Sequence, residues 1–225
     1  DQMVGRVKYM LSQPGFIIFY YLKKLLFPIN LNVDPDIEVV INFFSSSFLI
    51  PALCIVFLLV GSFRIFKSRI ILFFLCWFFI ILSPSSSIVT LHDLAAEHRS
   101  YLASAGIFIL LAYGASEISC KWGKPKSLQI LLIYFLFLGM LGVLTIKRNT
   151  VWQSELSLWQ DTYQKSPYKL SPLINLARAY SLLGDTDKAI EYYQEALYKG
   201  PMIFAVNYNL GDLYIYTHLV ALLRH

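Results

Sequence analysis

The chain has 225 residues, of which 57% are hydrophobic, 16% aromatic and only 15% charged, and its formal net charge is +5. Soluble domains contain about 45–50% apolar and about 25% charged residues, so this composition excludes an ordinary globular protein and predicts that part of the chain lies in lipid. The apolar content also excludes intrinsic disorder, and three cysteines are too few for a disulfide scaffold.

The charged residues divide the chain near Lys147. Residues 1–146 contain 18 charged residues, bunched between long uncharged stretches, whereas residues 147–225 contain 15 that are spread evenly. We therefore expect a partial membrane domain over 1–146 and a helical region outside the membrane over 147–225. Most of the positive excess lies in loops between apolar runs, so it indicates no nucleic-acid partner.

Residues 12–29 form the first predicted element. Ser12 is suited to cap a helix that has Pro14 in its first turn. Lys23 and Lys24 fall on one side of this helix and apolar residues on the other, and two lysines in mid-segment are costly in a membrane span. The pattern favours an amphipathic helix that lies in the outer membrane interface, with a fifth span as the alternative.

Four windows without Asp, Glu, Lys or Arg follow, and each is long enough to cross the hydrocarbon core, which takes ~20 residues. They predict spans at about 43–63, 70–90, 100–118 and 127–146. The third window is rich in alanine, serine and glycine. Because small residues let membrane helices approach closely, we expect this span inside the bundle.

The loops between these spans differ in charge, and the difference predicts their orientation. Two linkers carry bases and no acid: Arg64, Lys67, Arg69, Lys121, Lys124 and Lys126. The alternate loops carry mostly acids, with Arg99 as their one base. The positive-inside rule then places the loops at 30–42 and 83–100, and everything after Ile146, on the non-cytoplasmic side. That side is the periplasm or exterior of a bacterium, or a lumen in a eukaryote.

The region after Lys147 contains a sequence repeat. Identical residues recur 34 positions apart: Pro167 and Pro201, Leu176 and Leu210, Tyr180 and Tyr214. This period is the length of a tetratricopeptide repeat. The large, small, aromatic and turn positions of that repeat are occupied by Leu176, Ala177, Tyr180, Gly184, Ala189, Tyr193, Ala196 and Pro201.

The repeat predicts a helical hairpin over 170–201, preceded by a capping helix at 150–165. A truncated second repeat is expected at 204–225, because His218 stands at its turn-glycine position. Such arrays bind proteins or peptides, although the fold does not identify the ligand. We therefore predict an all-α fold, in which a polytopic transmembrane helix bundle is followed by a tetratricopeptide-repeat array.

A polar cluster in the loop between the second and third spans is the one candidate for chemistry. It contains His92, Asp93, Glu97, His98, Arg99 and Tyr101. Arg99 is suited to bind a lipid-linked phosphate, and Glu97 or His98 to orient it or move a proton. The alternative is a solvated loop without function. The histidines and Asp93 have metal-binding side chains, but their spacing matches no metal motif.

Several motifs coincide in chain order with those of one known family. They are Gln13-Pro14, Tyr21 to Pro28, Leu31 to Asp34, Ala96 to Gly106 with its Glu97-His98-Arg99-Ser100-Tyr101 core, and Arg148-Asn149 with Trp152, followed by the repeat. With these motifs the chain resembles the C-terminal half of the membrane domain, plus the first repeats, of the transmembrane and tetratricopeptide-repeat-containing O-mannosyltransferases and their bacterial relatives.

The resemblance implies a GT-C-type glycosyltransferase that moves a sugar from a polyprenyl-phosphate donor to protein Ser or Thr on the outer or lumenal face. Arg99, with His98, Glu97 and Tyr101, then falls in the region that holds the lipid phosphate. The acidic loop that supplies the catalytic base in this family has no match in this sequence, which begins with Asp1. We therefore expect a fragment without catalytic residues that is inactive alone.

The resemblance also implies two kinds of partner: membrane lipid with the polyprenyl-phosphate donor, and an acceptor protein or peptide on the repeat. No cofactor is evident, and a divalent metal is left open. The main alternative function is a non-catalytic membrane-anchored scaffold whose repeat recruits proteins. A polysaccharide polymerase or ligase is a third possibility, but the loop at 83–100 is short for that class.

Overall fold

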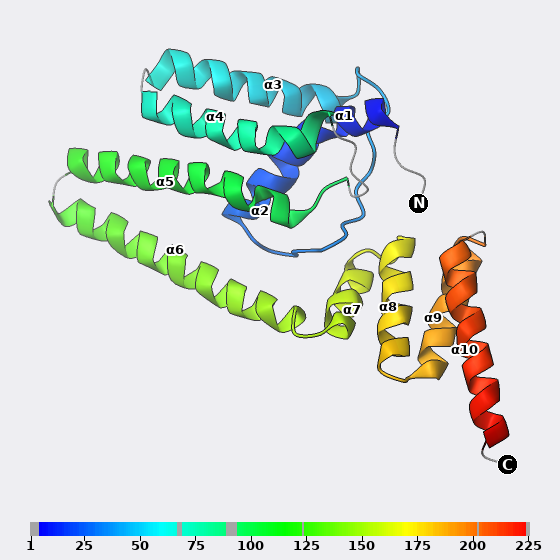
Figure 1. The fold of residues 1–225 in the computed structure, drawn as a ribbon. Helices are drawn as coiled ribbons and strands as arrows, with labels where there is room; N and C mark the ends of the chain where they lie inside the picture. Colours follow the sequence, from blue (N-terminus) through cyan, green and yellow to red (C-terminus); the bar gives the residue numbers. More distant parts are fainter. Residues whose placement is uncertain (1–4, 67–68, 89–93, 123, 202, 224–225) are drawn as a thin grey trace. The chain divides into compact units, whose positions relative to one another are not determined.

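The computed structural model describes residues 5–66, 69–88, 94–122, 124–201 and 203–223, and the described residues are helical with no strand (Figure 1). The predicted all-α fold is therefore confirmed. The chain divides into two compact units. We call residues 2–31 and 37–146 the membrane unit, and residues 32–36 and 147–225 the repeat unit.

The membrane unit begins with a continuous helix made of α1 (Arg6–Gly15), the π-helical segment η1 (Phe16–Leu22) and α2 (Lys23–Leu26). The prediction that Ser12 caps this helix was wrong, because the helix already begins at Arg6. Ser12 is buried, and its hydroxyl donates to the Lys8 carbonyl and accepts from the Val40 N–H, both at 2.9 Å. Pro14 lies inside the helix and removes one of its hydrogen bonds, and the π turns follow directly.

Four helices of the membrane unit follow. They are α3 (Ser46–Gly61), α4 (Arg69–Ser83), α5 (Ser100–Trp122) and α6 (Lys124–Val151), with π-helical extensions η2 (Ser62–Phe66) and η3 (Pro84–Ile88) after α3 and α4. Among the residues that the structure describes, four stretches are long and apolar enough to cross a membrane: Ser46–Arg64, Arg69–Ser86, Glu97–Ile118 and Leu128–Val151. They overlap the four predicted spans. The α6 helix continues beyond residue 146, where the last predicted span ended.

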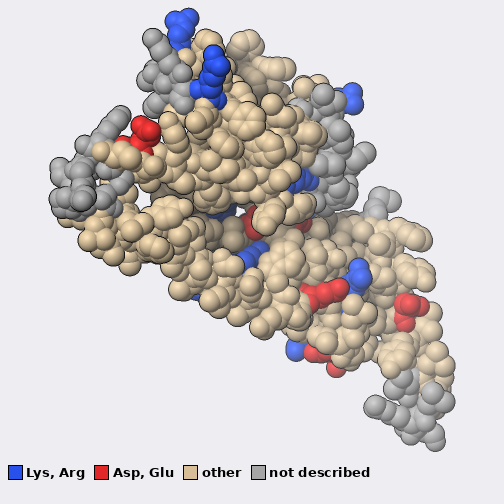
Figure 2. Space-filling view, turned by 60° about the vertical axis from the view of Figure 1, so that its left-hand side comes forward, with Lys and Arg blue, Asp and Glu red and all other residues tan. Residues whose placement is uncertain are grey.

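The surface of these helices is apolar. Large hydrophobic side chains such as Leu53 and Phe57 on α3, and Leu136 on α6, are exposed in the isolated chain. On the face drawn in Figure 2, charged side chains are few and uncharged residues cover most of the membrane unit. Soluble proteins rarely expose apolar patches of this kind, so the surface is suited to contact lipid or further membrane helices.

The α4 and α5 helices pack closely because α5 presents small residues to α4. A Cβ atom added at Gly106 would lie 2.7 Å from the backbone oxygen of Phe74 and 3.1 Å from the Trp77 ring. Ala103, one turn earlier, is fully buried. The indole N–H of Trp77 donates to the Leu102 carbonyl at 3.2 Å. Close approach of this kind is what small residues provide at membrane helix interfaces.

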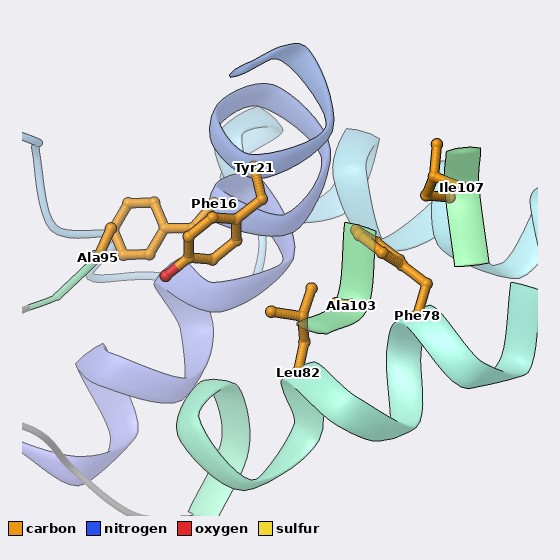
Figure 3. Packing of buried hydrophobic residues seen from close by; sticks show 7 residues of the cluster. All are labelled: Phe16, Tyr21, Phe78, Leu82, Ala95, Ala103 and Ile107. Carbon is orange, nitrogen blue, oxygen red and sulfur yellow. The ribbon is translucent and has the colours of Figure 1, made fainter. Parts of the chain in front are cut away.

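A buried cluster joins these two helices to the N-terminal helix (Figure 3). Its members are Phe16, Tyr21, Phe78, Leu82, Ala95, Ala103 and Ile107. Figure 3 shows the Phe16 ring beside Ala95 and the Tyr21 ring near Leu82. Nearer the N-terminus of the same helix, the Tyr9 hydroxyl donates to the Ser85 carbonyl at 2.5 Å, which fixes α1 against η3.

The repeat unit contains α7 (Glu155–Lys165), α8 (Leu170–Leu182), α9 (Thr186–Lys199) and α10 (Phe204–Leu223). The α7 helix starts at a capping box between Ser154 and Ser157, so the capping helix begins later than the predicted residue 150. Between α8 and α9, Gly184 takes a φ of +79°, a conformation that favours glycine. The Asp185 side chain then accepts from the Lys188 N–H and caps α9.

The signature residues build the core of this hairpin. Leu176, Ala177, Ala189, Tyr193 and Ala196 are all buried, with Ala177, Ala189 and Ala196 at 0% exposure. These small side chains allow the two helices to approach, as the repeat pattern requires. The α10 helix runs without a break through His218, which stands 34 positions after Gly184. The second repeat therefore contributes one long helix, since no residue at that position breaks the helix as Gly184 does.

One contact in the repeat unit has no signal in the local sequence. The Ser166 side chain is fully buried and forms three hydrogen bonds with the segment 32–36. It accepts from the Asn32 side-chain amide at 2.7 Å and from the Asp36 N–H at 3.0 Å, and it donates to the Asp34 carbonyl at 2.9 Å. This segment precedes the first span in sequence but belongs to the repeat unit.

Candidate functional site

The candidate site is built on the loop at residues 94–100, which enters α5. Ala95 and Ala96 are buried, at 2% and 3% exposure, and anchor the loop in the core of the membrane unit. A single 3-10 turn, η4 (Glu97–Arg99), follows and continues into α5 at Ser100. The Ser100 hydroxyl donates to the Glu97 carbonyl at 2.8 Å. The sequence therefore holds its charged residues on a short rigid turn at the start of a candidate membrane span.

The N-terminal helix holds this loop through three polar side chains. The Gln13 amide donates to the Leu94 carbonyl at 3.4 Å. The Ala96 N–H donates to the Tyr21 hydroxyl at 3.3 Å, and the Tyr20 hydroxyl donates to Glu97 Oε1 at 3.5 Å. These contacts join residues that lie 75 to 81 positions apart in the chain.

The two tyrosines pack edge to face, with ring centroids 5.5 Å apart. Burial raises the pKa of the Tyr21 hydroxyl, while the Ala96 N–H and the charge of Arg99 lower it by less. The phenol is therefore neutral at physiological pH and lies close to the Arg99 guanidinium. On the other side of Tyr20, the Lys24 ammonium lies 5.9 Å from the ring centroid and donates to the Asn30 carbonyl at 2.6 Å.

The predicted site residues differ in how far their side chains are exposed to solvent. Glu97 and Arg99 are half-buried and face the tyrosines of the N-terminal helix. His98 is exposed, and Tyr101 is 83% exposed on the first turn of α5. His92 and Asp93, the remaining members of the predicted cluster, lie outside the described residues.

Gln13, Tyr20 and Tyr21 were not predicted as site residues. The sequence signal that could have indicated Gln13 and Tyr21 is their place in the Gln13-Pro14 and Tyr21 to Pro28 motifs, which resemble one family together with the Glu97–Arg99 turn; Tyr20 lies in neither motif. Their contacts with the loop depend on the tertiary fold, so periodicity and composition did not reveal them.

The arrangement can bind an anion and orient a polar group. It combines the Arg99 guanidinium and the Glu97 carboxylate, both on one turn at the end of an apolar helix, with the neutral Tyr21 phenol of the N-terminal helix. A guanidinium binds phosphate oxygens with two parallel hydrogen bonds. Within the described ranges, no group of three His, Cys, Asp or Glu side chains is placed to hold a metal ion.

A second candidate surface lies in the repeat unit, between α8 and α10. A groove of about 460 Å³ is lined by polar residues that include Arg178, Ser181, Asn209, Asp212 and Tyr216. Arg178 and Asp212 are 34 positions apart, so they occupy the same place in successive repeats with opposite charge. At the base of the groove, the Asn209 amide donates to the Tyr193 hydroxyl at 3.1 Å.

The outer side of the hairpin is closed by aromatic rings. Tyr180 and Tyr192 stack with an interplanar angle of 8° and centroids 5.5 Å apart, and Tyr163 meets Tyr192 edge to face. The Tyr163 hydroxyl donates to Glu195 at 2.9 Å, and Lys199 binds the same carboxylate at 2.7 Å. This polar and aromatic contact joins α7 to α9.

The Arg148 and Trp152 motif also has a structural role in the repeat unit. The Arg148 guanidinium donates to Asp161 at 2.9 Å and lies 5.9 Å from the centroid of the Trp152 ring. Lys165 binds the same carboxylate at 2.7 Å. The motif therefore ties the end of α6 to α7.

The described part of the chain contains four helices fit to span a membrane, followed by a helical hairpin with tetratricopeptide spacing, which defines a membrane-associated repeat protein. The tetratricopeptide repeat family model matches residues 172–201 and confirms the predicted repeat. Curated relatives are protein O-mannosyl-transferases. The chain is 34% identical to Tmtc2 of Drosophila melanogaster over 116 residues, which are 51% of this chain and 12% of that protein.

Two further relatives are also named protein O-mannosyl-transferases. Human TMTC1 is 29% identical over 52% of this chain and 13% of its own length, and mouse TMTC3 is 26% identical over 66% of this chain and 16% of its own length. The resemblance that the motifs predicted is thus confirmed at the level of the family. The matched region is a small part of each relative. No solved structure matches the chain.

Proposed function

We propose that this chain forms the donor-binding and acceptor-presenting part of a membrane glycosyltransferase. The reaction is transfer of a sugar from a polyprenyl-phosphate donor to a Ser or Thr hydroxyl of a protein. The relatives are named as protein O-mannosyl-transferases, which supports mannose as the sugar. The observation that carries the proposal is the Glu97–Arg99 turn, held by the N-terminal helix at the end of a candidate span.

Arg99 binds the phosphate that leaves with the lipid. Its guanidinium lies at the mouth of an apolar helix, where the head of a lipid-linked donor meets its hydrocarbon tail. Basic side chains at this depth are costly and tend to mark a substrate path. Glu97, on the same turn, orients the sugar or the phosphate, and the exposed His98 and Tyr101 contact the part of the donor outside the turn.

The attacking hydroxyl needs a base, and we assign none in this chain. In this proposal the catalytic carboxylate comes from outside this chain, which aligns with only 12% to 16% of each relative. This stretch alone is therefore inactive. No cofactor is part of the proposal.

The orientation follows from the loop charges. Arg64 and the other bases of the two basic linkers face the cytoplasm, so the turn at 97–99 and the repeat unit lie on the opposite side. The donor head and the acceptor protein then meet in one compartment, which is a lumen in eukaryotes and the periplasm or exterior in bacteria.

The repeat unit presents the acceptor protein. Its groove is lined by the cation of Arg178, the anion of Asp212 and further polar side chains, a surface suited to an extended peptide. The same groove favours the second candidate function, a membrane-anchored scaffold that recruits proteins without catalysis. The two functions differ in whether Arg99 is needed for sugar transfer.

The test uses the full-length protein in membranes with polyprenyl-phosphate mannose and an acceptor protein. Arg99→Ala should lower transfer about a hundredfold, and Arg99→Lys should restore part of it, because charge-assisted hydrogen bonds hold phosphate. Arg64→Ala, which removes an exposed arginine from a linker, is the matched control and should keep transfer. Wild-type transfer in Arg99→Ala would exclude the enzymatic proposal and leave the scaffold.

A further inference from the structure

We propose that Tyr21, together with Tyr20, is a positioning residue of the donor site. The two tyrosines hold the loop at residues 94–100 so that Glu97 and Arg99 face the phosphate of the lipid-linked sugar. This inference rests on the proposed function and identifies residues through which the N-terminal helix acts on it.

The first support is the local shape of the N-terminal helix. Tyr20 and Tyr21 are neighbours in sequence, yet both reach the same loop, one at Glu97 and the other at Ala96. Neighbouring side chains of an α-helix diverge by about 100°. The π turns of η1 contain more residues per turn, so neighbours diverge less. Such turns occur frequently at functional sites, and this one aims two phenols at one turn of chain.

The second support is the burial of Tyr21 and the partners of its hydroxyl. The residue is 1% exposed, and its ring packs in the cluster with Phe16, Leu82 and Ala95. The ring therefore cannot move without opening the core. Its oxygen accepts from the Ala96 N–H, the amide directly before the Glu97–Arg99 turn. This bond fixes where the turn begins.

The third support is that the two tyrosines contact both Glu97 and Arg99. Tyr20 donates to the Glu97 carboxylate, and the Arg99 guanidinium lies beside the Tyr21 hydroxyl. Tyr21 therefore touches the backbone before the turn and the cation at its end. A change confined to this hydroxyl alters the direction of Arg99 and leaves the aromatic packing intact.

The test is Tyr21→Phe in the full-length protein, which removes the hydroxyl and keeps the ring. The KM for the polyprenyl-phosphate donor should rise about tenfold, as expected for the loss of one hydrogen bond to a charged group, with the acceptor KM unchanged. Tyr9→Phe is the matched control. Tyr9 is equally buried on the same helix, but its hydroxyl binds the Ser85 carbonyl and does not touch the loop. In Tyr9→Phe, the KM values for the donor and for the acceptor should therefore stay within about twofold of the wild type.

A double variant separates positioning from general stability. If Tyr21 acts through Arg99, adding Tyr21→Phe to Arg99→Lys should raise the donor KM by much less than it does in the wild type. Equal effects in both backgrounds would overturn the inference. So would equal donor KM values for Tyr21→Phe and Tyr9→Phe.

The failure of this inference is distinguishable from failure of the proposed function. Wild-type transfer in Arg99→Ala would overturn both together. Loss of transfer in Arg99→Ala with an unchanged donor KM in Tyr21→Phe would overturn the positioning role alone. A rise in the amide hydrogen-exchange rate of Ala96 in Tyr21→Phe, and not in Tyr9→Phe, would support it without relying on activity.

Discussion

The ammonium of Lys169 binds the carboxylate of Asp34, a residue 135 positions earlier in the chain. The same ammonium donates to the Pro35 carbonyl at 3.3 Å, next to the Ser166 hydroxyl with its three hydrogen bonds. The corner between α7 and α8 is thus a binding site for a short extended segment of the same chain. Half-buried Lys169 and buried Ser166 supply its specificity.

Ser166→Ala should destabilise the repeat unit by about 2 kcal/mol, because it removes the three hydrogen bonds that the buried Ser166 hydroxyl forms with the Asn32 amide, the Asp36 N–H and the Asp34 carbonyl. The measurement is amide hydrogen exchange of α8 in the purified full-length protein. Thr186→Ala is the control, because the exposed Thr186 hydroxyl has only a 3.4 Å contact with the Gly184 carbonyl. Equal exchange in both variants would show that the corner contributes no stability.

Tyr163 makes the repeat unit sensitive to alkali. Burial, and then its hydrogen bond to Glu195, raise the pKa of Tyr163 from 10.0 to about 12. The folded state therefore keeps a proton that the unfolded state loses, so the stability that this group contributes below pH 10.0 disappears as the pH rises through about 12.

Tyr163→Phe should therefore flatten the loss of melting temperature in this alkaline range, because the titrating hydroxyl is gone. Tyr198→Phe, at a ring that is 90% exposed, should leave the loss as it is in the wild type. The measurement is the melting temperature of α7 to α9 against pH. An equal slope in wild type and Tyr163→Phe would contradict the assignment.

Gly106→Ala should separate α4 from α5 and destabilise the membrane unit by about 1–3 kcal/mol, as overpacking does. The added Cβ meets the Phe74 backbone oxygen, which cannot rotate away as a side chain can. Gly114→Ala on the same helix is the matched control, because nothing lies within 4 Å of its Cβ. Thermal unfolding in detergent compares the two, and equal melting temperatures would refute the close contact.

Gly184→Ala should destabilise the repeat unit by about 1–2 kcal/mol, the cost of a side chain in the left-handed region. Gly211→Ala should act in the opposite direction, by up to about 1 kcal/mol, because Gly211 lies inside α10 with open space at its Cβ. The melting temperatures of the two variants should lie on opposite sides of the wild type. Destabilisation by both would contradict the assigned turn.

Local patterns predicted the helices well. The 34-residue spacing indicated the α8 and α9 hairpin because its large and small signature residues form a buried core and Gly184 forms the turn between the two helices. Uncharged windows indicated the candidate spans because length and composition alone determine whether a helix can cross lipid. Ser12 was misassigned because only its local sequence was considered. A serine shortly before a proline fits a helix cap, and only the tertiary contact with the Val40 N–H shows that Ser12 is buried inside the unit.

The candidate site was predictable only in part. Its charged loop stands out in sequence because Asp93, Glu97 and Arg99 follow a long stretch, residues 70–92, without Asp, Glu, Lys or Arg. Tyr21 and Gln13 do not stand out in sequence, since their partners are backbone groups of a loop about 80 positions away. Almost any residue type at position 96 would offer the same backbone N–H. The exposure of His98 and Tyr101 likewise depends on the direction in which α5 starts.

The segment 32–36 has a consequence for how the protein can be divided. The repeat unit is discontinuous in sequence, so a fragment expressed from Lys147 onward lacks an extended segment of its own unit and leaves the Ser166 and Lys169 corner open to solvent. We expect a synthetic peptide with the sequence of residues 32–36 to complete such a fragment in trans, because Ser166 and Lys169 supply its contacts. Excision at a single boundary therefore yields two incomplete pieces.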